Sequence, residues 1–234
     1  MDYFIQTINN ILKKFFDMDP LRICILGDSN SSPHQIYSDS LWHIKEMYWY
    51  SLSELNFEVL PIAFVRNSTR RILQMSDFFI KNAKCDIFII QIGVNDLTSS
   101  VVKKNSFTDF FYKRFSKTIL GKKLINNYYK SQQHKIENNS FEEDLNQVID
   151  YIKKYNAVKK FIFLSIPYAT KEKNNLIIKY NDIIDKVSSE NNGIFLNYFY
   201  DQEKDHSLIS DDLHYSKKLH QIISKKLIEI ISDL

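Results

Sequence analysis

The stretch LRICILGDSN, residues 21–30, decides how the rest of the chain is interpreted. Five of its first six residues are apolar, and Gly27 ends the apolar run. A short apolar run closed by glycine is typical of a strand that is buried on both faces in a parallel sheet. A second run of this kind, CDIFIIQI at residues 85–92, ends at Gly93 in the same way. We therefore expect two buried parallel strands, each followed by a turn.

Three further runs resemble these strands, and helical stretches lie between them. The expected strands are residues 21–26, 57–65, 85–92, 159–166 and 193–199. The expected helices are residues 39–55, 69–81, 141–155, 174–189 and 216–231. Strands that alternate with helices form right-handed βαβ crossovers and a parallel sheet covered on both faces. The sequence therefore predicts an α/β fold, a three-layer α/β/α sandwich around a five-stranded parallel sheet.

Two segments lie outside this alternating pattern. Residues 1–18 carry apolar side chains at helical spacing, which predicts an amphipathic leader helix that packs on the rest of the protein or on a partner. Residues 97–140 hold nine basic and two acidic residues, a local net charge of +7. Their mixture of lysines with aromatic and aliphatic residues predicts one or two helices over the carboxyl edge of the sheet. We expect a single domain over residues 19–234, decorated by this basic insertion.

The overall composition favours a globular protein and argues against several other classes. Of the 234 residues, 44% are hydrophobic and 25% are charged, which are ordinary values for one folded domain. The apolar runs are far shorter than the roughly 18 residues that a membrane-spanning helix needs. Asp2 precedes the first apolar residues and lysines follow them, the reverse of a signal peptide, so a cytoplasmic location is expected.

Net charge argues against a nucleic-acid-binding protein, and the position of the cysteines argues against a disulfide. A formal net charge of +3 is too small to indicate a nucleic-acid-binding protein, and no known nucleic-acid-binding motif accompanies the basic insertion. Cys24 and Cys85 lie in or beside apolar strands, where we expect free buried thiols.

Polar residues with complementary chemistry follow the strands. In an open parallel sheet, ligands bind beyond the carboxyl ends of the strands. Ser29 follows the first strand, Asn95 follows the third, and Asp211 and His214 come just before the closing helix. A nucleophilic serine needs a base to take its proton and a carboxylate to orient that base, and an amide can stabilise the oxyanion that forms. Taken singly, these residues also suit a turn, an Asx-turn and a helix N-cap.

Together, the three segments resemble the SGNH (GDSL-like) family of serine hydrolases. The matching motifs are GDS at residues 27–29, GVND at 93–96 and DDLH at 211–214. The resemblance runs from about residue 21 to the C-terminus, without the insertion, and implies that family's flavodoxin-like sandwich. It implies that Ser29 is the nucleophile and also an oxyanion-hole donor through its N–H. By the same resemblance Asn95 donates to the oxyanion hole and His214 is the general base.

The carboxylate that orients His214 is assigned by the same resemblance. Asp211 completes the triad, with Asp212 as second choice. No cofactor and no metal ion are expected.

One part of the chain departs from the family pattern. The family has a glycine after its second strand, whose N–H is the third oxyanion donor, whereas residues 65–69 here read VRNST. Asn67 is the nearest counterpart, and asparagine tolerates a left-handed backbone better than most residues while keeping its N–H. Arg66, Arg70 and Arg71 add positive charge nearby, which suits either an anionic substrate or a solvated helix face.

Other hydrolase types and other site residues are disfavoured. The chain has no G-x-S-x-G motif, which an α/β-hydrolase requires, and its remaining histidines lack metal-ligand spacing. The neighbouring pair Asp205 and His206 could mimic the Asp–His pair, but it does not lie at the entry of the closing helix.

The sequence therefore predicts a serine esterase that hydrolyses a short-chain acyl ester, an O-acetyl group on a carbohydrate or another anionic small molecule. An O-acyltransferase with the same triad is the nearest alternative. A different class stays open: an inactive binding or scaffold protein whose basic insertion contacts an acidic partner or a membrane surface. The sequence makes no prediction of the oligomeric state.

Overall fold

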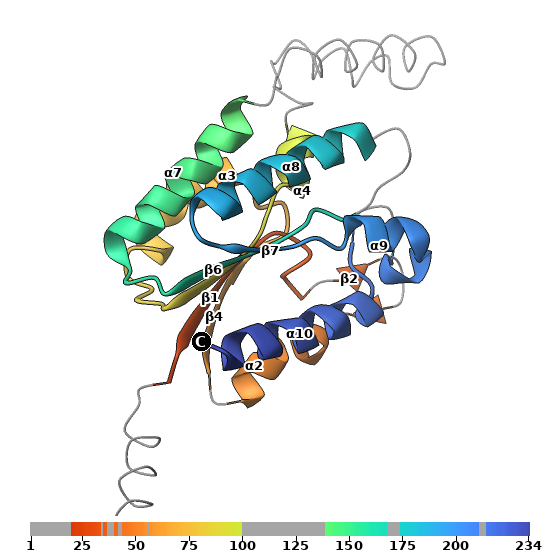
Figure 1. Ribbon diagram of the computed structural model, residues 1–234, viewed down its shortest axis with the longest axis horizontal. Coiled ribbons are helices and arrows are strands. Elements are labelled where there is room, and N and C mark those ends of the chain that lie inside the picture. The colour runs from red at the N-terminus through yellow and green to blue at the C-terminus, as the bar shows by residue number, and fades with distance from the viewer. Residues whose placement is uncertain are drawn as a thin grey trace, which may run out of the picture.

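The computed structural model describes residues 20–33, 35–36, 40–41, 44–55, 57–99, 139–167, 174–210 and 214–234. A five-stranded sheet with strand order β4-β1-β5-β6-β7 lies between two layers of helices (Figure 1). All neighbouring strands in this sheet are parallel. The strands are β1 (Arg22–Gly27), β4 (Glu58–Ala63), β5 (Ile87–Gln91), β6 (Lys160–Leu164) and β7 (Ile194–Leu196).

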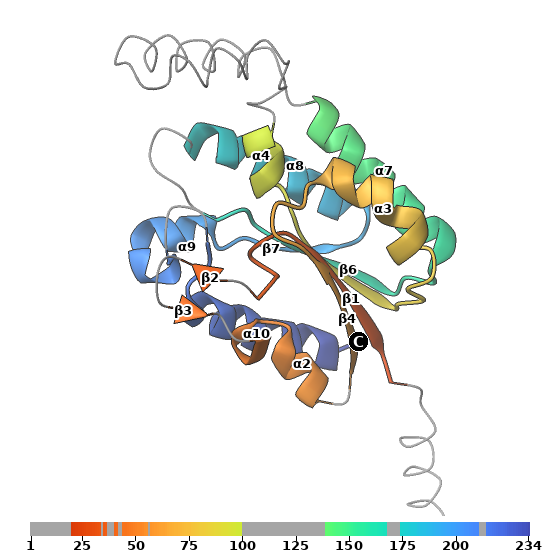
Figure 2. The same cartoon turned by 180° about the vertical axis from the view of Figure 1, so that it is seen from behind.

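Helices cover both faces of the sheet, as the two opposite views show (Figures 1 and 2). One face carries α3 (Thr69–Phe79), α4 (Val94–Ser99), α7 (Asn139–Tyr155) and α8 (Asn174–Glu190). The other face carries α2 (Tyr50–Glu54) and α10 (Lys217–Ser232). Short elements complete the described chain: β2 (Gln35–Ile36), β3 (Ser40–Leu41), η1 (Ile44–Glu46), α9 (Phe199–Lys204) and η2 (His206–Leu208).

The core consists of two apolar layers that the sheet separates. Along β5, Phe88 and Ile90 belong to the cluster shared with α3, α7 and α8, whereas Ile87 and Ile89 belong to the cluster shared with α2 and α10. Successive side chains of a strand point to opposite faces, so a continuous apolar run is what a strand covered on both sides requires.

The predicted three-layer sandwich with a five-stranded parallel sheet is confirmed. The helices predicted at residues 69–81, 141–155, 174–189 and 216–231 are also found, with ends that differ by one or two residues. The strand predicted at 193–199 is shorter: β7 covers Ile194–Leu196, and α9 begins at Phe199.

The helix predicted at residues 39–55 is wrong. The described part of this stretch contains β3, which pairs antiparallel with β2, and then η1 and the short helix α2. The tertiary contacts of two aromatic residues explain the difference. Met47, Tyr48 and Trp49 are consecutive and all buried, an arrangement that does not fit one face of a helix. Trp49 Nε1 donates to the carbonyl of Ser31 at 2.8 Å, and the Tyr48 hydroxyl lies 2.7 Å from Ser31 Oγ.

Several expectations concern residues outside the described ranges. The leader helix at residues 1–18 and most of the basic insertion at 97–140 fall there, so the division into leader, domain and insertion stays a prediction. Cys24 and Cys85 are described, and both are buried free thiols. No helix in the described part of the chain is long and apolar enough to cross a membrane.

Candidate active site

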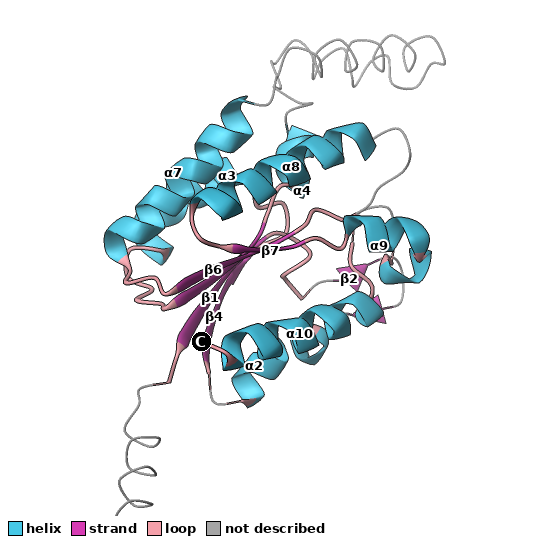
Figure 3. Ribbon diagram, in the orientation of Figure 1, coloured by secondary structure: helices cyan, strands magenta, loops and turns pink. Residues whose placement is uncertain are grey.

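Ser29 lies on a tight turn at the carboxyl end of β1. Figure 3 shows the loops that leave the strands at this edge of the sheet. The Ser31 N–H donates to the Asp28 carbonyl at 3.1 Å, and the Asn30 N–H donates to Asp28 Oδ1 at 2.9 Å. A Cβ atom on Gly27 would lie 2.2 Å from the Ser31 Cβ, so the turn can close only on glycine.

The structure brings His214 to this turn. His214 Nε2 lies 3.0 Å from Ser29 Oγ, across 185 residues of sequence. This is hydrogen-bond distance and the geometry that a serine and its general base require. The His214 carbonyl accepts from the Ser210 N–H at 2.9 Å, and Ile209 and Tyr215 form an antiparallel bridge, so the backbone of residues 214–215 is joined to that of residues 209–210.

The main-chain N–H of Ser29 is the predicted first donor to an oxyanion. Ser29 is 6% exposed. Among the described residues its N–H has no hydrogen-bond acceptor, although the turn around it is hydrogen-bonded. A developing oxyanion on a substrate bound at Ser29 Oγ would provide such an acceptor.

Asn95 lies in the first turn of α4, directly after the neighbouring strand β5. The chain enters this helix through Gly93, whose φ is 126° and whose Cβ would lie 2.5 Å from Ile166 Cδ1. β1 and β5 pair directly, with Gly27 opposite Gln91. The segments that carry Ser29 and Asn95 therefore leave adjacent strands at the same edge.

Asn67 differs from its predicted conformation. The left-handed backbone of this turn falls on Arg66, with φ of 63°, and not on Asn67. The Asn67 N–H donates to the Phe64 carbonyl at 3.1 Å, and its side-chain amide donates to the Gly27 carbonyl at 3.0 Å. Asn67 thus ties the turn after β4 to the end of β1. Its N–H could serve an oxyanion only if the bond to Phe64 opened, so its role as third donor stays a prediction.

Two neighbouring aspartates are the predicted carboxylates that orient His214. Asp211 and Asp212 lie outside the described residues. The alternative that an aspartate caps the closing helix is wrong, because Ser216 is the N-cap of α10 and accepts from the Leu219 N–H.

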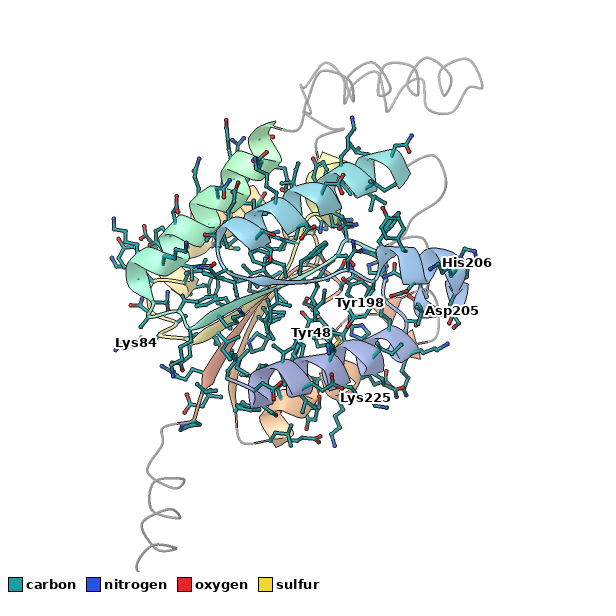
Figure 4. All side chains as sticks on the ribbon, viewed as in Figure 1. Tyr48, Lys84, Tyr198, Asp205, His206 and Lys225 are labelled. Carbon is teal, nitrogen blue, oxygen red and sulfur yellow. The ribbon has the colours of Figure 1, made fainter. Side chains whose placement is uncertain are left out.

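Asp205 has a structural role of its own. Hydrogen bonds from Lys218 and Ser207 lower the pKa of Asp205 to about 2. Figure 4 shows Asp205 and His206 on the outside of the molecule beside α9. This aspartate caps η2 and forms a surface ion pair with Lys218.

A buried polar cluster that the sequence analysis did not identify supports the turn of Ser29. Ser31 Oγ donates to Gln91 Oε1 at 3.0 Å, which leaves the Tyr48 hydroxyl to donate to Ser31. Burial raises the pKa of Asp28 to about 7, and hydrogen bonds from Asn30 and Gln91 offset part of that rise. Asn30 and Ser31 directly follow the GDS motif in the sequence, whereas Tyr48 and Gln91 are brought to it only by the fold.

Asp96 also has a structural partner that its motif did not reveal. Its carboxylate accepts from the Thr69 N–H at 3.1 Å and from the Thr69 hydroxyl. The GVND segment after β5 is therefore joined to the start of α3, which follows β4.

Comparison with known proteins shows similarity at the level of structure. No family model matches the chain, and no curated protein matches its sequence. Axe2, an acetylxylan esterase from Geobacillus stearothermophilus, is 16% identical, with a TM-score of 0.61 over 91% of this chain and 95% of that one. A lipase/acylhydrolase from Enterococcus faecalis is 14% identical, with a TM-score of 0.59 over 90% and 95%.

A GDSL-like lipase from Parabacteroides merdae is also 14% identical, with a TM-score of 0.61 over 90% and 95% of the two chains. Structures of catalytic mutants of Axe2, with alanine in place of a serine, an aspartate or a histidine, match equally well. The chain therefore has the α/β fold of the GDSL-like, or SGNH, hydrolases.

Proposed function

We propose that this protein is a serine esterase in which Ser29 attacks the ester carbonyl. The observation that carries this proposal is the 3.0 Å contact between Ser29 Oγ and His214 Nε2 at the carboxyl edge of the sheet. Catalytic mutants of Axe2 concern a serine, an aspartate and a histidine, and that aspartate and histidine are three residues apart. Asp211 and His214 have the same spacing.

The reaction follows from this contact. His214 Nε2 takes the Ser29 proton as Ser29 Oγ forms a bond to the acyl carbon. The tetrahedral intermediate collapses, the C–O bond to the alcohol breaks, and His214 returns the proton to the leaving alcohol. Water, deprotonated by His214, then attacks the acyl carbon, the bond from that carbon to Ser29 Oγ breaks, and His214 returns the proton to Ser29 Oγ as the free acid leaves. Asp211 fixes the imidazole tautomer and stabilises the imidazolium in both steps.

Two donors stabilise the oxyanion in this proposal. They are the Ser29 N–H and the side-chain amide of Asn95, which come from adjacent strands. Losing one such donor costs about 3 kcal/mol of transition-state stabilisation. Because the Asn67 N–H has another acceptor, turnover rests on the first two donors.

The substrate that we propose carries a short acyl group, an O-acetyl group on a carbohydrate. Axe2, an acetylxylan esterase, supports the acyl group, and the lipase neighbours make long-chain esters the comparison to exclude. Arg70 does not support an anionic substrate, because its Nε lies 3.6 Å from Asp144 Oδ2 of α7. This distance indicates an ion pair between the faces of two helices.

A serine-directed fluorophosphonate probe tests the nucleophile. We expect one probe per chain by intact mass and the label on Ser29 by peptide mapping. Ser29→Ala should abolish labelling and His214→Ala should slow it severely, while Ser53→Ala, an exposed serine of α2, serves as the matched control. A folded protein that is unlabelled, or labelled elsewhere, would rule out the assignment.

A substrate panel tests the acyl group and the type of reaction. Esters of 4-nitrophenol from acetate to palmitate should show highest kcat/KM for acetate, and acetylated xylo-oligosaccharides should release acetate. A preference for long chains would contradict the acetyl proposal. Transfer of the acetyl group to added sugar, in place of its release into water, would identify an O-acyltransferase instead.

A further inference from the structure

We propose that Asn30 is a positioning residue that sets the distance between Ser29 and His214, acting through the backbone of Tyr215. This inference rests on the proposed function. Asn30 Oδ1 accepts a hydrogen bond from the Tyr215 N–H at 2.7 Å. Asn30 directly follows the nucleophile and Tyr215 directly follows the base. Two contacts therefore join the same two segments side by side, one between the reacting atoms and one next to them.

The acceptor is held rigidly on the nucleophile's turn. Asn30 is fully buried, and its own N–H donates to Asp28 Oδ1 at 2.9 Å. The Asp28 N–H in turn donates to the carbonyl of Gln91 on the neighbouring strand at 3.1 Å. The oxygen that Tyr215 meets is thus fixed relative to β1 and β5, the strands that carry the site.

The donor residue, Tyr215, is held in place through its side chain. Tyr215 is fully buried, and its hydroxyl donates to the carbonyl of Ser165, directly after β6. Its ring packs edge-on against His220 of α10 with centroids 5.8 Å apart. The ring and the hydroxyl of Tyr215 are thus held by α10 and by the end of β6, and its main-chain N–H joins the same residue to the turn that carries Ser29.

His214 precedes this anchored residue in the chain. It is partly exposed, in contrast to the buried residue that follows it. Removing the Asn30 carbonyl would leave the backbone at 215 without its acceptor, and the loop would then move relative to Ser29. Misplacement of a catalytic group by about 1 Å is enough to lower a rate about 100-fold.

A purely structural role for Asn30 would give a different result, and another buried asparagine provides the control. Asn156 Oδ1 also accepts a buried backbone N–H from a distant segment, that of Cys85, at 3.2 Å. Asn156 follows α7, and Cys85 precedes β5 at the amino end of the sheet, opposite the site. Asn156→Ala should lower the melting temperature without changing the labelling rate of the folded protein.

The experiment measures the rate of fluorophosphonate labelling in four proteins that form a double-mutant cycle: wild type, Asn30→Ala, His214→Ala and the double variant. Asn30→Ala should slow labelling about 10- to 100-fold in folded protein. In the His214→Ala background the same change should have almost no effect, because the base on which Asn30 acts is already gone. Asn30→Ser, whose shorter side chain cannot reach Tyr215, provides the same comparison if the alanine variant does not fold.

Each outcome decides the proposal. Equal labelling of wild type and the Asn30 variants would overturn the positioning role alone. An Asn30 effect of the same size with and without His214 would also overturn it, since Asn30 would then act independently of the base. If wild type is not labelled at Ser29, the proposed function fails, and the positioning role fails with it.

Discussion

At the scale of single residues, the environment of Asp28 is the least expected feature of the site. This carboxyl is fully buried beside Ser29, and burial raises its pKa to about 7. Among the described residues its hydrogen-bonding partners, Asn30 and Gln91, are uncharged, and the charge of Asp96 raises the pKa further, so the neutral form is favoured below about pH 7 in the folded protein. The unfolded chain, with an ordinary pKa of 3.8, releases the proton far more readily.

The protein should therefore lose stability as the pH rises from about 4 to about 7, when compared with an Asp28→Asn variant. In that window the unfolded chain gives up the Asp28 proton while the folded protein keeps it. We expect the difference in the free energy of unfolding, Asp28→Asn minus wild type, to increase by up to about 4 kcal/mol across this window. Above the window the difference should stay constant. Urea denaturation at several pH values measures this difference.

Asp205 provides a control of opposite sign. Its pKa is lowered to about 2, so its contribution is present above the unfolded value of 3.8 and is lost as the pH falls from there. Parallel pH curves for wild type and Asp28→Asn would show that the carboxyl has an ordinary pKa.

The two candidate carboxylates of the triad can be separated by substitution. Asp211→Asn should lower kcat by about 10³- to 10⁴-fold, because the imidazole would lose its orienting carboxylate and adopt the wrong tautomer. Asp212→Asn is the matched control and should change kcat little. The reverse pattern, measured with 4-nitrophenyl acetate, would assign the role to Asp212.

At the scale of elements, the site depends on how the helices begin. α3 follows β4, and its first N–H, on Thr69, donates to Asp96 on α4. Ser68 caps the same helix through the Arg71 N–H. The first N–H groups of a helix have no partner within it, so a carboxylate from a neighbouring segment both stabilises α3 and anchors the segment that carries Asn95.

Removal of this carboxylate should therefore destabilise the protein. Asp96→Ala is expected to lower the free energy of unfolding by about 1–2 kcal/mol, the range found for helix caps. Asp96→Asn keeps an oxygen acceptor and should lose less. Thermal melting by circular dichroism compares the two, and equal melting temperatures for wild type and Asp96→Ala would show that Thr69 does not depend on Asp96.

At the scale of the whole molecule, stability and chemistry occupy different regions. The two apolar layers fill both faces of the sheet, whereas the polar residues of the site lie in turns at its carboxyl edge. Leu227 of α10 is fully buried in the layer shared with α2 and lies well away from the start of that helix.

A cavity in this layer should reduce stability and leave the chemistry intact. Leu227→Ala is expected to lower the free energy of unfolding by about 2–5 kcal/mol. The rate of fluorophosphonate labelling, measured well below the melting temperature, should remain within about twofold of wild type, since additivity holds for distant sites. A large loss of labelling in folded protein would show that the core and the site are coupled.

Local sequence patterns predicted most of the fold, because the buried faces of strands and helices require apolar residues at regular spacing. The runs that became β1 and β5 are mostly apolar, and the stretches that became α7 and α10 repeat apolar residues at helical spacing. The stretch at 39–55 misled the prediction because Tyr48 and Trp49 bind to Ser31 and interrupt the helix. These bonds join residues that are far apart in the sequence, so the local spacing of apolar residues does not predict them.

What the sequence determined by itself was the order of the strands and helices along the chain and the presence of a serine, an asparagine and an Asp–His pair at the ends of elements. Only the tertiary structure decided that Ser29 Oγ meets His214 Nε2 and that Asn30 holds Tyr215. The tertiary structure also decided that the Asn67 N–H donates to the Phe64 carbonyl. The physical reason is that the spacing of apolar residues reflects which side of each helix or strand is buried. A hydrogen bond between segments 185 residues apart depends instead on how the folded chain positions their two backbones.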